Sequence, residues 1–179
     1  TDQIYCVGGN ASQVSGATHR VFSYNPVTDT ITTLTTADDW PIAGSILPGG
    51  FAVAGNKLYI IGGNAFGATQ EVWQFDPNAA EGSRWLARSP LPVGRGWGVP
   101  AATIDGVIYT AGGGYYDELS HRIFGSTDSF KYDPVTDNWT SIASIPRRTW
   151  LTRAVVIENQ MWVLGGGTFY VSPTNDVNI

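Results

Sequence analysis

The chain has 179 residues, of which 42% are hydrophobic and only 14% are charged, against about 25% charged residues in an average soluble protein. This apolar content predicts a packed core rather than a disordered chain, and the length allows one ordinary domain or two small ones. No apolar run approaches the roughly 20 residues that a membrane-spanning helix requires, and a single cysteine excludes both an internal disulfide and a cysteine-based zinc site. The net charge of −5 argues against a nucleic-acid partner.

Glycine pairs recur along the chain at a nearly constant interval. The first pair, Gly8-Gly9, ends a β-rich run at residues 4–7, and the starts of successive pairs lie 54, 50 and 53 residues apart. Each later pair also follows a run rich in β-branched and aromatic residues, which predicts a strand that ends at the glycines. These later runs and pairs are residues 58–61 before Gly62-Gly63, residues 107–111 before Gly112-Gly113, and residues 161–164 before Gly165-Gly166.

Two further markers follow each of the first three glycine pairs. An aromatic residue, then Asn or Asp, then Pro forms the second marker, and an apolar residue two positions earlier gives the alternation of a half-buried strand. A tryptophan closes the second and third units, and an isoleucine takes its place in the first. These markers are Phe22 and Tyr24-Asn25-Pro26 with Ile31, Trp73 and Phe75-Asp76-Pro77 with Trp85, and Phe130 and Tyr132-Asp133-Pro134 with Trp139.

Between the markers each unit is predicted to form four antiparallel strands. No segment combines a helical period with capping signals, so no helix is expected. Gly55-Asn56 and Asp105-Gly106 are turns of the kind that tolerates positive φ, each between the first two strands of a unit. The predicted strands are residues 51–54, 58–61, 71–75 and 85–88 in the second unit, and residues 101–104, 107–111, 129–132 and 139–142 in the third.

This combination of markers resembles the kelch motif, in which a glycine pair ends one strand, a tyrosine lies in the next, and a tryptophan follows. The period agrees with the figure of about 50 residues for a kelch repeat, and the resemblance covers essentially the whole chain. It implies a β-propeller, a ring of about 4–8 four-stranded sheets, or blades, around a channel. The expected fold is therefore all-β, a kelch-type propeller segment.

The phase of the repeat predicts three to four blades, incomplete at both ends. Val177 and Ile179 are expected in a third strand, at the positions of Phe22 and Tyr24. The kelch resemblance implies a ring of about six or seven blades, so the chain is expected to be part of a larger ring. In the alternative, two copies of the chain complete one ring through exposed strand edges. The predicted blades are residues 1–40, which lack an inner strand, residues 44–92, residues 95–146, and residues 148–179 as the start of a fourth.

In kelch-like propellers the partner usually contacts one face, which is formed by the loops between second and third strands and by the segments that lead into the inner strands. The predicted loops vary in length while the strands do not, as is typical of binding loops on a rigid scaffold. The longest loop offers an aromatic pair beside mixed charges for a glycan or a peptide; the alternative is a solvated insertion. The loops are residues 10–19, 64–69, 114–127 and 168–175, and the longest carries Tyr115, Tyr116, Asp117, Glu118, His121 and Arg122.

The segments that lead into two inner strands repeat an arginine and a tryptophan. Arg95 and Trp97 align with Arg148 and Trp150, and Arg153 adds positive charge nearby. The planar guanidinium group suits a carboxylate, so these arginines are candidates for binding an acidic ligand; the alternative is that they brace a neighbouring blade. The candidate binding residues are therefore Arg95, Trp97, Tyr115, Tyr116, Glu118, His121, Arg148, Trp150 and Arg153.

Catalytic signals are weak. Some similar propellers are copper oxidases that use two tyrosines, two histidines and a cross-linked cysteine, but here His19 and His121 lie in different units and Cys6 is expected as a small core residue. Others are sialic-acid mutarotases, which Glu118 beside an arginine would imitate. No nucleophile elbow, phosphate loop or His-Glu-x-x-His motif is present. The sequence predicts no catalytic residue, no cofactor and no metal site.

The favoured function is a non-catalytic recognition or scaffold module that binds a protein or a carbohydrate. The alternatives are a fragment of a propeller enzyme acting on a sugar or a carbonyl compound, and a structural subunit that assembles through open blade edges. Asn10 and Asn138 begin triplets that match the N-glycosylation pattern, and the chain has only two lysines. These features favour a secreted or cell-surface location, with the cytoplasm as the alternative.

Overall fold

The structure is a computed structural model that describes residues 3–12, 16–41, 47–64, 67–169, 172–173 and 177–178. Its regular elements are short strands and one turn of 3-10 helix, η1 (Thr36–Asp38), and no α-helix occurs among the described residues. No helix in the described ranges has the length and apolar character needed to cross a membrane. The predicted all-β class is confirmed.

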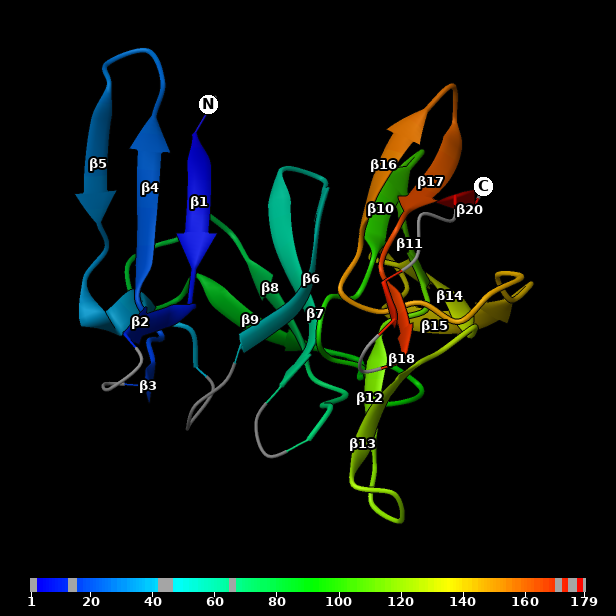
Figure 1. Ribbon diagram of the computed structural model, residues 1–179. Coiled ribbons are helices and arrows are strands. Elements are labelled where there is room, and N and C mark those ends of the chain that lie inside the picture. The colour runs from blue at the N-terminus through cyan, green and yellow to red at the C-terminus, as the bar shows by residue number, and fades with distance from the viewer. Residues whose placement is uncertain are drawn as a thin grey trace.

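Four antiparallel sheets follow one another along the chain and stand side by side (Figure 1). The second and third sheets each have four strands in chain order, as the repeat predicts, and the other two have three described strands each. The first sheet contains β1 (Ile4–Val7), β4 (Val21–Asn25) and β5 (Thr30–Thr33), and the second contains β6 (Leu47–Ala54), β7 (Lys57–Asn64), β8 (Val72–Phe75) and β9 (Trp85–Arg88). The third contains β10 (Ala101–Ile104), β11 (Val107–Ala111), β14 (Ser129–Asp133) and β15 (Asn138–Ile142), and the fourth contains β16 (Arg153–Ile157), β17 (Gln160–Leu164) and β20 (Val177–Asn178).

Two predicted strand positions require correction. β6 begins at Leu47 rather than at Phe51, because residues 47–50 continue the ladder against the end of β7. In the last unit Val177 pairs with Leu164, which precedes a glycine pair, just as Val21 pairs with Val7. Val177 therefore lies one position before the place of Phe22, and the predicted register was wrong by one residue, which exchanges the two faces of a strand. Ile179 lies outside the described residues.

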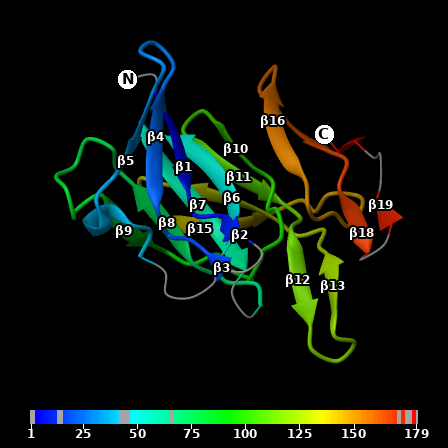
Figure 2. The same ribbon diagram turned by 60° about the vertical axis from the view of Figure 1, so that its left-hand side comes forward.

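Segments expected as loops form two further sheets at one end of the molecule. The longest loop folds into a hairpin of β12 (Gly114–Asp117) and β13 (Arg122–Gly125), which projects away from the four sheets (Figure 2). β13 pairs in turn with β18 (Gly167–Phe169), which follows the last glycine pair and pairs with β19 (Ser172–Pro173). A smaller hairpin joins β2 (Asn10–Ser12) to β3 (Gly16–Ala17). The aromatic and β-branched residues of the long loop favour strands, so the segment predicted as a loop is instead a paired hairpin.

The core lies between neighbouring sheets, because each sheet buries side chains on the face that meets the next. Phe75 of β8 is fully buried and contacts Tyr5 of β1 at 5.3 Å between ring centroids. Tyr59 and Tyr132 meet edge to face across the next interface at 5.9 Å. Residues buried at the first interface are Val7, Val21, Trp40, Ile60 and Phe75, and those at the second are Ala52, Ala54, Tyr59, Ile61, Val72, Leu91, Ile108, Phe130 and Tyr132.

The repeated tryptophans bridge neighbouring sheets through their indole nitrogens. Trp85 Nε1 donates to the Asp38 carbonyl oxygen at 2.8 Å, and Trp139 Nε1 donates to the Ser89 carbonyl oxygen at 2.9 Å. In both cases the acceptor belongs to the segment that follows the preceding sheet. Ile31 holds the equivalent register position opposite Tyr24 but is exposed. The tryptophan marker therefore identifies a contact between blades.

Cys6 is exposed, which corrects the expectation of a core residue. Side chains alternate along β1, so Tyr5 and Val7 point to the second sheet while Ile4 and Cys6 point the other way. Within the described residues nothing packs closely over that second face, and Ile4 is also exposed. The small size of the cysteine side chain carried no information about which face of the strand it occupies.

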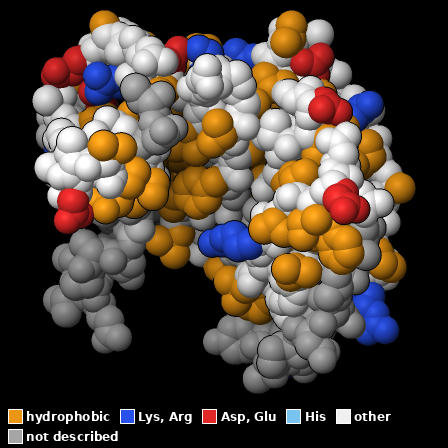
Figure 3. All heavy atoms as spheres, turned by 90° about the horizontal axis from the view of Figure 1, so that it is seen from above, with side chains coloured by type: hydrophobic (Ala, Val, Ile, Leu, Met, Phe, Trp, Pro, Cys, Tyr) orange, Lys and Arg blue, Asp and Glu red, His pale blue; other side chains and the backbone are white. Residues whose placement is uncertain are grey.

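The inner strands form an apolar wall in the hollow between the outer sheets. β6, β10 and β16 lie next to one another, and their side chains line a groove of about 280 Å³. Figure 3 looks down on this end of the molecule and shows hydrophobic side chains gathered in the hollow. The groove residues are Phe51, Ala52, Val53, Ala101, Ala102, Thr103, Ala154, Val155 and Val156.

Asp137 provides a prediction about the interface between the second and third sheets. Burial raises the pKa of this carboxyl, but hydrogen bonds from the Tyr132 hydroxyl and the Ser89 amide and the charge of Arg88 outweigh it and hold the pKa below its ordinary value. A depressed folded pKa stabilises the protein above the unfolded pKa, and this contribution is lost as the pH falls through the folded value. We therefore expect Asp137→Asn to reduce the loss of stability between about pH 5 and pH 2, measured as urea midpoints.

The matched control is Asp29→Asn, at the equivalent turn of the first sheet. Asp29 has φ 52°, close to the 54° of Asp137, and its carboxylate accepts a hydrogen bond from the exposed Tyr24 hydroxyl. Its variant tests whether the turn position alone produces the effect. Equal effects of the two substitutions would contradict the assignment to the interface.

Candidate functional site

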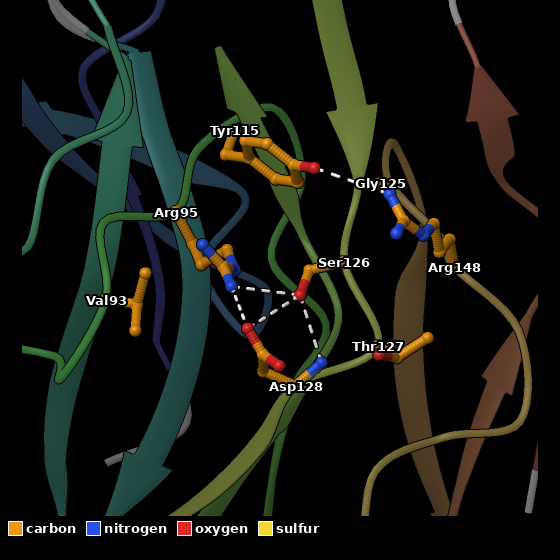
Figure 4. Close-up of a pocket in the computed structure, with 8 residues that line it drawn as sticks. All are labelled: Val93, Arg95, Tyr115, Gly125, Ser126, Thr127, Asp128 and Arg148. Carbon is orange, nitrogen blue, oxygen red and sulfur yellow. Dashed lines mark hydrogen bonds and ion pairs between the residues drawn. The ribbon is translucent and has the colours of Figure 1, made fainter. Parts of the chain in front are cut away.

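A pocket of about 300 Å³ is lined by residues of the β12–β13 hairpin and of the loop segments around it. Its walls come from the segment that leads into β10, the start of β12, the segment between β13 and β14, and the segment that leads into β16. These are the loop classes expected to form the binding face. The lining residues, shown in Figure 4, are Val93, Arg95, Tyr115, Gly125, Ser126, Thr127, Asp128 and Arg148.

Arg95 forms the base of the pocket and is only 4% exposed. Its backbone is fixed against the second sheet, since its amide donates to Thr69 O at 3.0 Å and its carbonyl accepts from Gly63 N at 2.9 Å. The guanidinium donates to Gly94 O at 2.8 Å and to Ser126 Oγ at 2.9 Å, and it forms an ion pair with Asp128. Burial lowers the pKa of Arg95, an effect that Asp128 opposes.

Ser126 and Asp128 form a polar turn immediately before β14. The Asp128 amide donates to Ser126 Oγ at 3.0 Å, and that hydroxyl donates to Asp128 Oδ2 at 2.9 Å. The same oxygen, Oδ2, receives the Arg95 guanidinium. The carboxylate is thus oriented by two contacts, while the Asp128 side chain remains 46% exposed.

Tyr115 and Arg148 form the outer rim of the pocket. The Tyr115 ring covers Arg95, with the guanidinium carbon 5.5 Å from the ring centroid, and it stacks on Phe124 of the same hairpin at 6.0 Å. Its hydroxyl points outward to Arg148, whose Nη1 donates to it at 3.4 Å (Figure 4). Arg148 itself is exposed. The two arginines therefore contact the same tyrosine, one at its face and one at its hydroxyl.

The predicted equivalence of Arg95 and Arg148 is wrong by one residue. Arg95 pairs with Thr69 at the place where Thr149 pairs with Ser126, so Thr149 is the structural counterpart of Arg95. The first segment contains two consecutive residues with positive φ, Trp97 and Gly98, whereas the second contains one, Leu151. The first segment is therefore one residue longer than the second, counted from this pairing to the glycine pair that follows. Arg95 is therefore buried, and Arg148 is left on the surface.

The other predicted candidates lie outside the pocket. Trp150 is buried and pairs through its backbone with Gly167, and Trp97 is half-buried. Tyr116 Oη and His121 Nδ1 share a hydrogen bond of 3.1 Å on the exposed hairpin, where Glu118 is also exposed. Arg153 is exposed, and its Nη1 donates to the Thr152 carbonyl oxygen at 2.9 Å. The structure thus brings together three of the nine candidates, Arg95, Tyr115 and Arg148.

Sequence reasoning missed the acidic member of the site, Asp128. The available signal was the polar triplet Ser126-Thr127-Asp128 directly before a predicted strand, a pattern typical of side-chain-stabilised turns. Within the ranges that the structure describes, no three His, Cys, Asp or Glu side chains gather as a metal site would require. The pocket offers charge recognition: one exposed guanidinium, one exposed carboxylate and an aromatic ring.

Comparisons with known proteins agree with the fold. No family model matches the sequence. The chain is 32% identical over 172 residues to the kelch-like protein terF of Aspergillus terreus (strain NIH 2624 / FGSC A1156), covering 93% of this chain and 36% of that protein. It is 33% identical over 111 residues to human kelch repeat and BTB domain-containing protein 13, covering 60% of this chain and 22% of that protein.

The solved structure of YjhT superimposes on 90% of this chain with a TM-score of 0.74 and 17% identity, which supports the fold alone. The chain spans about half of that structure and about a third or less of the two kelch relatives. The repeat markers, the consecutive four-stranded antiparallel sheets and these similarities show that the chain belongs to the kelch-repeat β-propeller family.

Proposed function

We propose that the chain is a non-catalytic, protein-binding part of a kelch propeller, and that its partner contacts the face containing the pocket of Arg95, Tyr115, Asp128 and Arg148. The observation that carries the proposal is that one pocket is built from both loop classes of this face. Kelch-like relatives support a protein as the partner. A glycan remains the alternative ligand, and no feature of the pocket favours it.

The same proposal treats residues 1–40, 44–92, 95–146 and 148–179 as successive blades of a larger ring. The four successive sheets support this division, and the share of each relative that the chain spans supports a larger ring; assembly of two copies through open edges is the alternative. The kelch-like relatives fit the cytoplasmic alternative for the location and give no support to the secreted or cell-surface one.

Peptide-display selection tests the proposed face. Selected peptides should bind Arg148→Ala about tenfold more weakly than the wild type, because a hydrogen bond to a charged group contributes about 1.5–3 kcal/mol. Tyr115→Phe, which removes only the hydroxyl at the rim, should weaken binding less. Arg148 is exposed, so its replacement leaves the core intact, and thermal denaturation should confirm an unchanged midpoint.

The matched control is Lys131→Ala, which removes one exposed positive charge from β14, outside the pocket lining. It should bind every selected peptide as the wild type does. If peptides bound Arg148→Ala and the wild type equally, or if only glycans on an array bound in a manner that depends on Arg148, the proposed function would be wrong.

A further inference from the structure

We propose that the pocket recognises two opposite charges presented together: an acidic side chain of the partner at Arg148 and the Tyr115 hydroxyl, and a basic side chain at Asp128. The inference rests on the proposed function, because it names the chemistry of the partner that this same pocket accepts. It replaces the expectation that two arginines hold one carboxylate.

Arg95 is closed to a ligand. Its side chain is 5% exposed, whereas that of its ion-pair partner Asp128 is 46% exposed. The guanidinium donates to Gly94 and Ser126 and pairs with Asp128, and the Tyr115 ring covers it. A ligand entering the pocket therefore meets the carboxylate of this ion pair and not the guanidinium.

Asp128 has one carboxylate oxygen, Oδ1, that is available to a ligand. Its Oδ2 accepts hydrogen bonds from both the Arg95 guanidinium and the Ser126 hydroxyl, and its Oδ1 accepts no hydrogen bond from any residue in the described part of the chain. The turn holds the carboxylate in place before any ligand arrives. A lysine or arginine side chain of the partner would complete its coordination with a charge-assisted hydrogen bond.

Arg148 lies at the other side of the pocket. Among the described residues its guanidinium meets only the Tyr115 hydroxyl, at 3.4 Å, and no carboxylate. Five donors in a planar fork suit an acidic side chain of the partner, and the hydroxyl lies beside them as a further donor. One exposed cation and one exposed anion thus line a single pocket.

The size of the pocket limits what enters. About 300 Å³ lies at the lower end of ligand pockets, which hold roughly 300–1,000 Å³. This space suits the ends of two side chains from one short segment and not a folded element. Complementary charges at fixed positions set specificity and register more than affinity, so the pair should decide which segment binds and in which direction.

A set of synthetic peptides tests the inference. Each peptide carries one glutamate and one lysine on the same uncharged scaffold, separated by one, two or three residues, with partners in which either charge or both are replaced by glutamine. In fluorescence anisotropy the best paired peptide should bind at least tenfold more tightly than its doubly neutral form and more tightly than either singly charged form.

Variants of the protein assign each charge to its residue. Arg148→Gln should remove the preference for glutamate and retain that for lysine, and Asp128→Asn should do the reverse. The amide oxygen of an asparagine still accepts from Arg95 and Ser126, and an unchanged denaturation midpoint would verify the fold. Lys131→Gln and Glu71→Gln, which change exposed charges outside the pocket, are the matched controls.

The outcomes separate this inference from the proposed function. Equal binding of the paired peptide and its glutamate-only form would overturn the inference, while binding that still depends on Arg148 would leave the proposed function intact. Lysine preference that persists in Asp128→Asn would also overturn it. Absence of any binding that depends on Arg148, for these peptides and for peptides selected by display, would overturn both.

Discussion

A protein carrying Gly62→Ala is expected to lose about 3 kcal/mol of unfolding free energy or more, from strained backbone and overpacking together. Gly62 lies near the end of β7 in a left-handed conformation, with φ 63°, and a Cβ added there would lie 2.2 Å from the Arg95 carbonyl oxygen. No rotation of a side chain relieves this contact, because the obstructing atom belongs to the backbone. The Arg95 segment would have to move, which would also disturb the base of the pocket. Urea denaturation measures the loss.

Gly106→Ala is the matched control for this effect. Gly106 has φ 79° in the turn between β10 and β11, and a Cβ there would meet nothing within 4 Å. Its replacement carries only the backbone strain, about 1–2 kcal/mol. If the two variants lost equal stability, the close approach of the Arg95 segment would contribute nothing, and the requirement for glycine would reduce to the turn conformation.

Replacement of Trp40 by alanine should cost about 3–5 kcal/mol, the range typical of large aromatic side chains removed from a core. Trp40 is 1% exposed and packs with Val7, Ile60 and Phe75 between the first two sheets. It lies in an irregular segment whose position is fixed by the hydrogen bond from its amide to the His19 carbonyl oxygen, at 2.9 Å. The cavity left by the indole would weaken the packing of the first sheet against the second.

Trp40→Phe distinguishes packing from hydrogen bonding at the same position. The indole Nε1 is buried without a hydrogen-bond partner among the described residues. Replacement by phenylalanine therefore removes side-chain volume but breaks no hydrogen bond. We expect a loss below about 2 kcal/mol. Leu119→Ala, at a side chain 94% exposed on the hairpin tip, should leave stability unchanged in the same denaturation series. A phenylalanine variant as unstable as the alanine variant would mean that the indole nitrogen is bonded after all.

Much of the fold was predictable because its markers follow from backbone requirements. The glycine pair is needed at the end of the second strand of a unit, where the backbone of the segment leading into the next sheet comes close, as the Arg95 segment does at Gly62. Trp85 and Trp139 recur because each donates to a carbonyl group of the segment that follows the preceding sheet. Such constraints repeat with the blade, so their spacing in the sequence identifies the fold.

The candidate site was only partly predictable, because its geometry depends on departures from the repeat. Arg95 and Arg148 lie equally far before the glycine pairs at Gly112 and Gly165, but the extra left-handed residue Gly98 shifts one segment by a position, so only Arg95 is buried. Asp128 belongs to the site because it pairs with the Arg95 side chain, which lies 33 residues away in the sequence. Cys6 was misplaced for a similar reason: alternation along β1 fixes two opposite faces, but residue type did not reveal which face is covered.

The pairing of β13 with β18 makes two neighbouring repeats share one sheet. In most repeat architectures stability is close to a sum of separate units and their interfaces. Here backbone hydrogen bonds cross the boundary, and Thr149 makes two more with the third unit: its amide donates to the Ser126 carbonyl oxygen at 3.1 Å, and its own carbonyl oxygen accepts from the Gly113 amide at 3.0 Å. We therefore expect the third and fourth units to open together in hydrogen exchange, as one cooperative block that encloses the pocket. An exchange of blades between related propellers would have to carry both units to preserve it.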